Sequence, residues 1–71
     1  MDRFNIGDTV YLRTDPAQDE YIVVEIMRLE NSGGVRVTYM ISGDGSAFWV
    51  YGIEISNEAD EMKKLEHKER Y

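Results

Sequence analysis

Residues 21–29 read Tyr-Ile-Val-Val-Glu-Ile-Met-Arg-Leu, and this stretch decides the fold class of the 71-residue chain. Its β-branched residues fit a pleated, half-buried surface, so we expect the longest strand here. Period-two alternation divides the stretch into a buried and an exposed face: Ile22, Val24 and Ile26 inward, and Tyr21, Val23, Glu25 and Met27 outward. Continuing that alternation would turn Arg28 inward, so we expect a bulge or sharp bend near Met27–Arg28.

Shorter extended segments flank this strand on both sides. Val10 and Leu12 alternate with polar neighbours over residues 8–13, and a second clean alternation runs over 35–41. Residues 47–51 and a short closing segment at 53–55 complete the set, separated by turn-rich stretches at 14–20, 30–34 and 42–46. Five short strands in so small a chain favour an SH3-like antiparallel barrel, because closure removes exposed strand edges.

The tail has a different character and reads as a helix over residues 57–70. Ser56 or Asn57 can cap its first N–H groups, acidic residues lie in its first turn, and basic residues lie toward its end. Its apolar stripe is thin and consists of Ala59, Met62 and Leu65. We therefore divide the chain into a barrel at 1–56 and a C-terminal helical extension at 57–71, within a single domain.

The net charge of the chain indicates which classes of partner it can bind. The chain has 8 Lys and Arg against 14 Asp and Glu, a formal net charge of −6, and residues 1–56 contain no lysine. Nucleic-acid binding relies on basic groups that neutralise phosphates, so we expect no direct contact with DNA or RNA. An acidic body attracts basic partners, or imitates a polyanion toward a protein that binds one.

Composition offers little chemistry for catalysis. Without cysteine there is no thiolate nucleophile or disulfide, and the single histidine, His67, lies among charged residues of the predicted helix. The loop carboxylates Asp15, Asp19 and Glu20 lack the spacing of a calcium loop, and Gly43-Asp44-Gly45 lacks the lysine of a phosphate loop. We expect no enzyme activity, no cofactor and no metal.

No apolar run approaches the 18 or so residues of a membrane-spanning helix, and the first residues lack the features of a signal peptide. The sequence therefore predicts a soluble, cytoplasmic protein that does not bind a membrane.

Exposed aromatic rings are the most informative feature. If Phe48 and Val50 face inward, then Trp49 and Tyr51 face outward, although the opposite register of 47–51 stays open. Tyr11 and Tyr21 would face outward as well. These rings either form a binding patch or cation-binding cage, or pack under the acidic loop and the helix.

The order of parts resembles SH3-like small barrels, especially Tudor and KOW domains. The resemblance covers residues 4–56 and rests on Gly7-Asp8-x-Val10, the strand ending in Tyr39, the Asp44-Gly45 turn, Trp49-Val50-Tyr51 and Ile53-Glu54-Ile55. The chain is also similar to small uncharacterised bacterial and phage proteins. A Tudor-like cage for methylated lysine or arginine would map onto Trp49 and Tyr51, with Tyr11 as a neighbour. KOW-type RNA contact does not suit a body without lysine.

The leading hypothesis is a non-enzymatic protein-interaction module that binds a basic protein partner. Its binding residues are Trp49, Tyr51 and Tyr11, supported by Asp15, Asp19 and Glu20. The alternative is a phage-type acidic inhibitor that mimics nucleic acid. A weak homodimer also stays open, because the helix stripe and outward Tyr21, Val23 and Met27 could bury one another across a two-fold axis.

Overall fold

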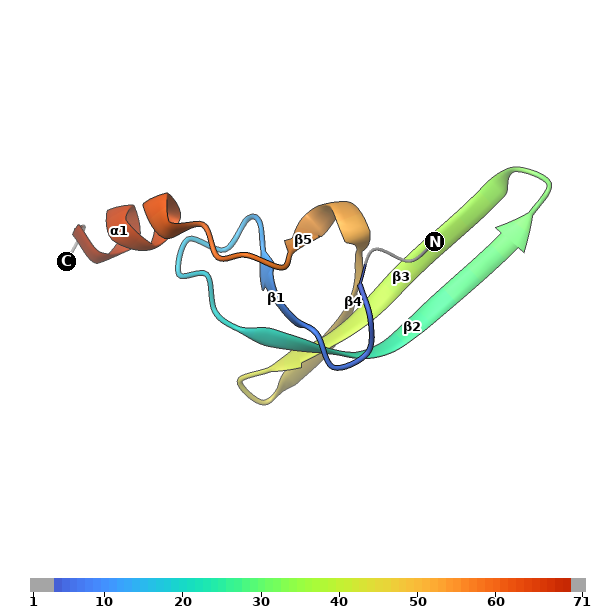
Figure 1. Ribbon diagram of the computed structural model, residues 1–71, viewed down its shortest axis with the longest axis horizontal. Helices are drawn as coiled ribbons and strands as arrows, with labels where there is room; N and C mark the ends of the chain where they lie inside the picture. The colour runs from blue at the N-terminus through green and yellow to red at the C-terminus, as the bar shows by residue number, and fades with distance from the viewer. Residues whose placement is uncertain (1–3, 70–71) are drawn as a thin grey trace.

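A computed structural model describes residues 4–69, with side chains as far as Glu66, and shows one antiparallel sheet followed by a helix (Figure 1). The strands are β1 (Thr9–Leu12), β2 (Tyr21–Asn31), β3 (Gly34–Gly43), β4 (Ser46–Tyr51) and β5 (Ile55–Ser56). A 3-10 turn, η1 (Gly52–Glu54), precedes β5, and the helix is α1 (Glu61–Glu69). The strand order is β4-β3-β2-β1-β5.

The predicted class, a mainly β chain with five antiparallel strands and a C-terminal helix, is confirmed, but the sheet is not closed into a barrel. Within residues 4–69, β4 and β5 stand at the two ends of the strand order and no ladder joins them. Residues 53 and 54, expected to begin the closing strand, belong to η1. Because β5 is therefore only two residues long, it pairs with β1 at Leu12↔Ile55 and Tyr11↔Ser56 and reaches no further.

The bulge in β2 lies nearer the start of the strand than predicted. The β2–β3 register shifts between Val23 and Glu25, so the extra residue is Val24 and the predicted bend at Met27–Arg28 is wrong. Val23 is fully buried, whereas Ile22 and Val24 are 46% and 44% exposed. An inserted residue exchanges the two faces of a strand. The predicted faces of β2 are therefore reversed before the bulge and hold after it, where Ile26 packs against the core and Met27 faces outward.

The core lies on the inner side of the curled sheet and draws on almost every element. Its fully or nearly buried side chains are Phe4, Val10, Val23, Tyr39, Ile41, Val50 and Ile55. The inward faces predicted for β1, β3 and β4 are confirmed, since Leu12, Val37 and Phe48 pack against this cluster. Phe4 contributes from outside the strands, with its ring edge-on to Tyr39 at 5.3 Å between centroids.

The distal part of the β2–β3 hairpin extends past the core as a two-stranded arm, which we define as residues 29–36 (Figure 1). Asn31 pairs with Gly34 across the tip, where Gly34 adopts φ +124°, a conformation open to glycine. The molecule measures 48 × 24 × 16 Å, and its radius of gyration is 13.6 Å. A compact chain of this length would have a radius of gyration of about 11 Å. Val35 is accordingly 53% exposed although it lies on the same face as Ile41.

Helix α1 begins at Glu61, four residues later than predicted, and Asp60 is its cap. The Asp60 Oδ1 atom accepts hydrogen bonds from the N–H groups of Met62 (3.1 Å) and Lys63 (3.2 Å). Ser56 instead accepts from Glu58 in the bend before the helix. Met62 and Leu65 are 65% and 51% exposed, so the predicted stripe is not buried against the sheet. Arg70, the end of the predicted helix, lies outside the described residues.

Gly43 offers a direct test of the packing between the β1–β2 loop and the end of β3. A Cβ atom at this position would lie 2.7 Å from the Glu20 carbonyl oxygen and 2.8 Å from Cδ1 of Tyr21. Backbone cannot yield cheaply, so we expect Gly43→Ala to lower the free energy of unfolding by about 1–3 kcal/mol in urea titrations. Ser46→Ala, at the exposed start of β4, is the control. Equal midpoints for both variants would show that the loop does not pack as described.

Candidate protein-interaction surface

Trp49 and Tyr51 stand on the outward face of β4, as one of the two predicted registers required. They are 38% and 51% exposed, whereas the intervening Val50 is 6% exposed. The β3 partners of these aromatic residues are Met40 and Thr38, which pair in turn with Glu25 and Met27 on β2. Side chains of directly paired residues lie on the same face of a sheet. We name the surface that results the aromatic face; it consists of Trp49, Tyr51, Met40, Thr38, Met27 and Glu25.

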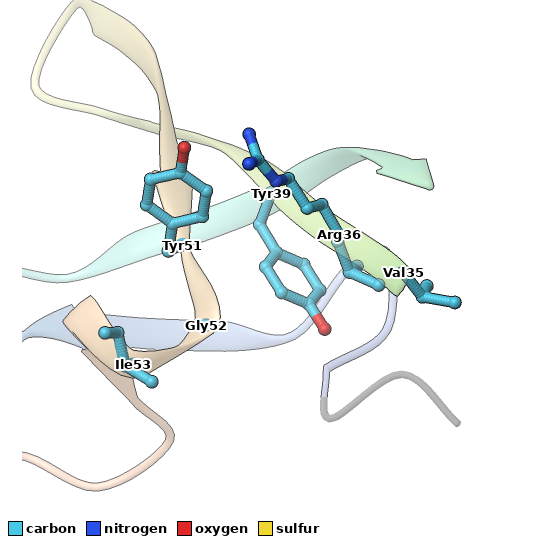
Figure 2. A pocket seen from close by; sticks show the side chains of 7 residues that line it. Val35, Arg36, Tyr39, Tyr51, Gly52 and Ile53 are labelled. Atoms are coloured by element: carbon cyan, nitrogen blue, oxygen red, sulfur yellow. The ribbon is translucent and has the colours of Figure 1, made fainter. Parts of the chain in front are cut away.

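A groove of about 390 Å³ opens beside the aromatic face, at the point where β4 ends. Gly52 turns the chain away from β3 there, so the edge of β3 from Val35 to Val37 has no partner strand among residues 4–69. Tyr51 and Ile53 lie on one side of the groove, Arg36 and Val35 lie on the other, and the Tyr39 ring lies between them (Figure 2). Tyr51 therefore belongs to both surfaces. Of the residues that line this groove, only Tyr51 was predicted as a site residue; Ile53, which is 75% exposed, was expected in a strand.

The carboxylate of Asp15 is used to build the β1–β2 loop. Its Oδ1 atom accepts the Ala17 N–H at 3.0 Å, and its Oδ2 atom accepts the Asp19 N–H at 2.9 Å. An aspartate that caps backbone N–H groups in this way fixes a turn. Of the three predicted loop carboxylates, Asp15 thus has a structural role, whereas Asp19 and Glu20 are exposed.

Gln18 connects this loop to the helix and is 2% exposed. Its Nε2 atom donates to the carbonyl oxygens of Leu12 (2.7 Å) and Asp15 (2.6 Å), and its Oε1 atom accepts the Asp60 N–H at 2.7 Å. Lys63 adds a second link by donating to the Arg13 carbonyl oxygen. The backbone at Gln18 adopts φ +53°, which is unusual outside glycine. Sequence reasoning missed Gln18, because nothing local distinguishes a glutamine that will be buried from one in solvent.

Tyr21 marks the place where the acidic loop meets the β3–β4 turn. Its ring packs edge-on against Phe48, at 5.6 Å between centroids. Burial raises the pKa of the Tyr21 phenol above its usual 10.0, and the negative charges of Asp15, Asp19 and Asp44 raise it further. The prediction that Tyr21 faces outward is therefore wrong, because its side chain packs against the core together with Phe48. This acidic cluster lies at the turn end of β4, about 17 Å along the strand from Tyr51.

Tyr11 lies apart from Trp49 and Tyr51 in the sheet. It is half-buried on β1 and pairs with Ser56 on β5, and two strands, β2 and β3, separate β1 from β4 in the strand order. The ladders therefore unite Trp49 and Tyr51, which are neighbours two residues apart on one face, and they leave Tyr11 on a different part of the sheet.

The described residues hold no group of three or more His, Cys, Asp or Glu side chains that could bind a metal ion. The His67 side chain lies outside the description. No helix in the described part of the chain is long and apolar enough to cross a membrane. Comparisons with protein-family models, with curated proteins and with solved structures found no match to this chain.

Gln18 should be needed for stability and for attachment of the helix. We expect Gln18→Ala to lower the free energy of unfolding by about 1–3 kcal/mol, because it removes the acceptor of the Asp60 N–H and one of the two hydrogen bonds that each of the Leu12 and Asp15 carbonyl oxygens accepts. Gln18→Gly relieves the positive φ and removes the same bonds, so it separates the two effects. Urea titration followed by circular dichroism measures both. If Gln18→Gly were as stable as wild type, backbone strain rather than hydrogen bonding would control this site.

Tyr21 should titrate at higher pH than an exposed tyrosine. Its pKa is raised in the folded state, so it contributes stability that is present below the unfolded value of about 10 and is lost as pH rises through the folded value. Ultraviolet difference titration of wild type against Tyr21→Phe isolates this phenol. Asp44→Asn should move the transition to lower pH by removing one of the three negative charges. An unchanged transition in Asp44→Asn would mean that the turn does not approach Tyr21.

Proposed function

We propose that the chain is a non-enzymatic protein-interaction module that binds a basic protein segment on the aromatic face. The observation that carries the proposal is the exposure of Trp49 and Tyr51 side by side on β4, with Met27 52% exposed in the same cross-strand row as Tyr51. Contiguous exposed aromatic and methionine side chains are typical of binding surfaces, where they supply most of the desolvated contact.

The position of Glu25 favours a cationic ligand group. Trp49, Met40 and Glu25 form one row across three strands, so the backbones at the two ends of the row are about 10 Å apart. That spacing leaves room for a lysine or arginine side chain to lie over Met40, with its charge between the indole face and the carboxylate. Asp19, Glu20 and Asp44 are too far along the sheet for such contact and would contribute long-range attraction.

The strand order also supports an SH3-like, Tudor-like architecture as a proposal. The last strand, β5, returns to pair with the first, β1, as closure of a small five-stranded barrel would require. In this proposal Trp49 and Tyr51 form two walls of a site for a cation. Tyr11 is not part of it, because its strand lies apart from β4 in the sheet.

A second candidate function, mimicry of nucleic acid, draws on the acidic cluster around Tyr21. Asp15, Asp19 and Asp44 act together on this phenol, so three carboxylates are near one another. The carboxylate of Asp15 is already bonded to two backbone N–H groups, which leaves Asp19 and Asp44 as the freer charges. This candidate needs no aromatic contact and therefore makes the opposite mutational prediction.

Arrays of synthetic peptides that contain lysine and arginine, with matched arrays in which glutamine replaces these residues, test the proposal. We expect binding to the basic peptides only, and we expect Trp49→Ala and Tyr51→Ala each to weaken it by about tenfold or more, as at interface hot spots. Tyr11→Ala is the matched aromatic control and should bind as wild type does.

The acidic cluster is tested with Asp19→Asn combined with Asp44→Asn in the same assay. Loss of binding in this variant together with full binding by Trp49→Ala would favour the nucleic-acid mimic and refute the proposal. Circular dichroism of each variant confirms that the sheet is intact.

A further inference from the structure

The outer edge of β4 is an unprotected strand edge. In the described part of the chain, β4 stands at one end of the strand order and pairs only with β3, whereas β5, at the other end, is only two residues long. Proteins protect such edges with charged residues, proline or bulges. The six residues of β4, Ser46–Tyr51, include no charged residue and no proline, and their register with β3 has no bulge. β4 is therefore a template for another strand.

The turn before β4 determines which of its residues direct hydrogen-bonding groups to this edge. Gly43 and Ser46 close a two-residue turn in which Asp44 and Gly45 have φ values of +49° and +76°. Positive φ at both central residues is typical of a hairpin turn whose closing pair is hydrogen-bonded. Bonded and non-bonded pairs then alternate along the antiparallel ladder. The N–H and C=O groups that point away from β3 therefore belong to every second residue of β4: Ala47, Trp49 and Tyr51.

The hydrogen bonding of Tyr51 agrees with this assignment. Its N–H donates to Oε2 of Glu54 at 2.9 Å instead of to β3. Among residues 4–69, Ala47 and Trp49 form no such bond at the outer edge. A strand added here can therefore bond to the N–H and C=O groups of these two residues, and the Glu54 carboxylate marks the end of the new ladder.

The acidic residues around this edge favour a basic strand. Residues 37–62 contain five acidic residues and no lysine, arginine or histidine. Two of the acidic residues flank the edge, because Asp44 lies in the turn before β4 and the carboxylate of Glu54 is bonded at the end of the strand. A basic segment that approaches the edge therefore meets complementary charge at both ends.

We propose that the basic segment of the proposed function, on which this inference rests, adds to β4 as an antiparallel strand. Main-chain hydrogen bonds hold a strand that binds in this way, and its alternate side chains give specificity. The residue opposite Trp49 lies on the aromatic face and extends the row of Trp49, Met40 and Glu25 by one strand. A lysine or arginine at this position crosses the indole with its charge directed toward Glu25.

The other face of the added strand has a different requirement. Its intervening side chains lie on the inner side of the sheet, beside Phe48 and Val50. Val50 is 6% exposed, and Phe48 packs against the core. Apolar side chains suit this position, because a charged group beside the core would lose water without gaining a partner. The ligand therefore alternates basic and apolar residues, and this pattern distinguishes strand addition from general attraction to an acidic surface.

Two other arrangements are less suited to these edges. If a second copy paired with β4 so that Trp49 met its counterpart, Asp44 and Glu54 of each chain would approach Glu54 and Asp44 of the other, and each chain has a net charge of −6. Like charges opposed across two strands are destabilising. The edge of β3 at residues 35–37 carries Arg36, which would repel a basic segment.

Backbone methylation of a synthetic peptide tests strand addition. The probe is a short peptide in which lysine and valine alternate, with both ends blocked, and calorimetric titration measures its affinity. In an antiparallel strand whose lysines lie opposite Ala47 and Trp49, the lysine N–H groups bond to β4 and the valine N–H groups point to solvent. We expect N-methylation of the lysines to weaken binding by about tenfold or more, and N-methylation of the valines to leave it unchanged. The two peptides carry equal charge, so electrostatic attraction alone cannot separate them.

Ala47→Pro applies the same test to the protein. The Ala47 N–H points away from β3, so proline preserves the β3–β4 ladder and removes one donor from the outer edge. We expect Ala47→Pro to weaken binding of the unmethylated peptide by about threefold or more. Ala47→Val, which keeps the N–H, should bind as wild type does. Circular dichroism checks that both variants are folded, and the methylated peptides decide the matter if Ala47→Pro is not.

The outcomes separate strand addition from the proposed function. Equal binding of the two methylated peptides would overturn strand addition, and loss with the valine-methylated peptide alone would overturn its antiparallel register. In both cases the proposed function would stand if Trp49→Ala still lost the unmethylated peptide. If basic peptides without alternation bound and the alternating peptide did not, strand addition alone would be refuted. If no basic peptide bound, both proposals would fail.

Discussion

The bulge at Val24 sets which residues of β2 face the core and which face outward. By inserting one residue between Val23 and Glu25, it buries Val23 in the core and then returns Ile26 to the same inner side. Without it, alternation from Val23 would bury Glu25 and Met27. The bulge thus determines that Glu25 and Met27 share the outward face with Trp49 and Tyr51.

A second set of contacts holds the parts of the chain that lie beyond the sheet ladders. Both polar atoms of the Gln18 side-chain amide form hydrogen bonds, to Leu12, Asp15 and Asp60. Gln18 therefore joins the end of β1, the acidic loop and the start of the helix. Hydrogen bonds of a buried amide are costly to leave unmade, which gives this polar contact a structural weight that the exposed apolar stripe of α1 lacks. The helix is therefore attached by its cap and its first turn.

The sequence predicted those elements whose two faces differ clearly. In β3 and β4 apolar and polar residues alternate, and the inward set of Tyr39, Ile41 and Val50 followed from period two. Residues 21–24 are apolar on both faces, so alternation could not show where the extra residue enters, and the faces of Ile22 and Val23 were exchanged. The start of the helix was wrongly predicted for a similar reason. Ser56, Asn57 and Asp60 can all cap a helix, and only the tertiary contact with Gln18 selects Asp60.

The candidate surface was predictable only in part, for a related reason. Trp49 and Tyr51 belong to one strand and share a face by local geometry, which the sequence contains. Strand register places Met40 and Glu25 beside Trp49, and the turn at Gly52 places Ile53 beside Tyr51. The register and the turn both depend on the whole sheet, so the sequence alone could not show these neighbours. Asp15 illustrates the reverse case. As a loop carboxylate it suggested a partner contact, and its backbone bonds reveal a residue that shapes the loop.

Amide hydrogen exchange along β2, measured by nuclear magnetic resonance on dilute protein, tests the phase that the bulge imposes. We expect protection at Val23, whose N–H is bonded to Asp8, and at Met27 and Leu29, whose N–H groups face β3. Glu30, which lies beyond them, should exchange freely. Protection of Glu30 with free exchange at Met27 and Leu29 would be the contrary result, since it would mean that β2 meets β3 one residue out of the described register.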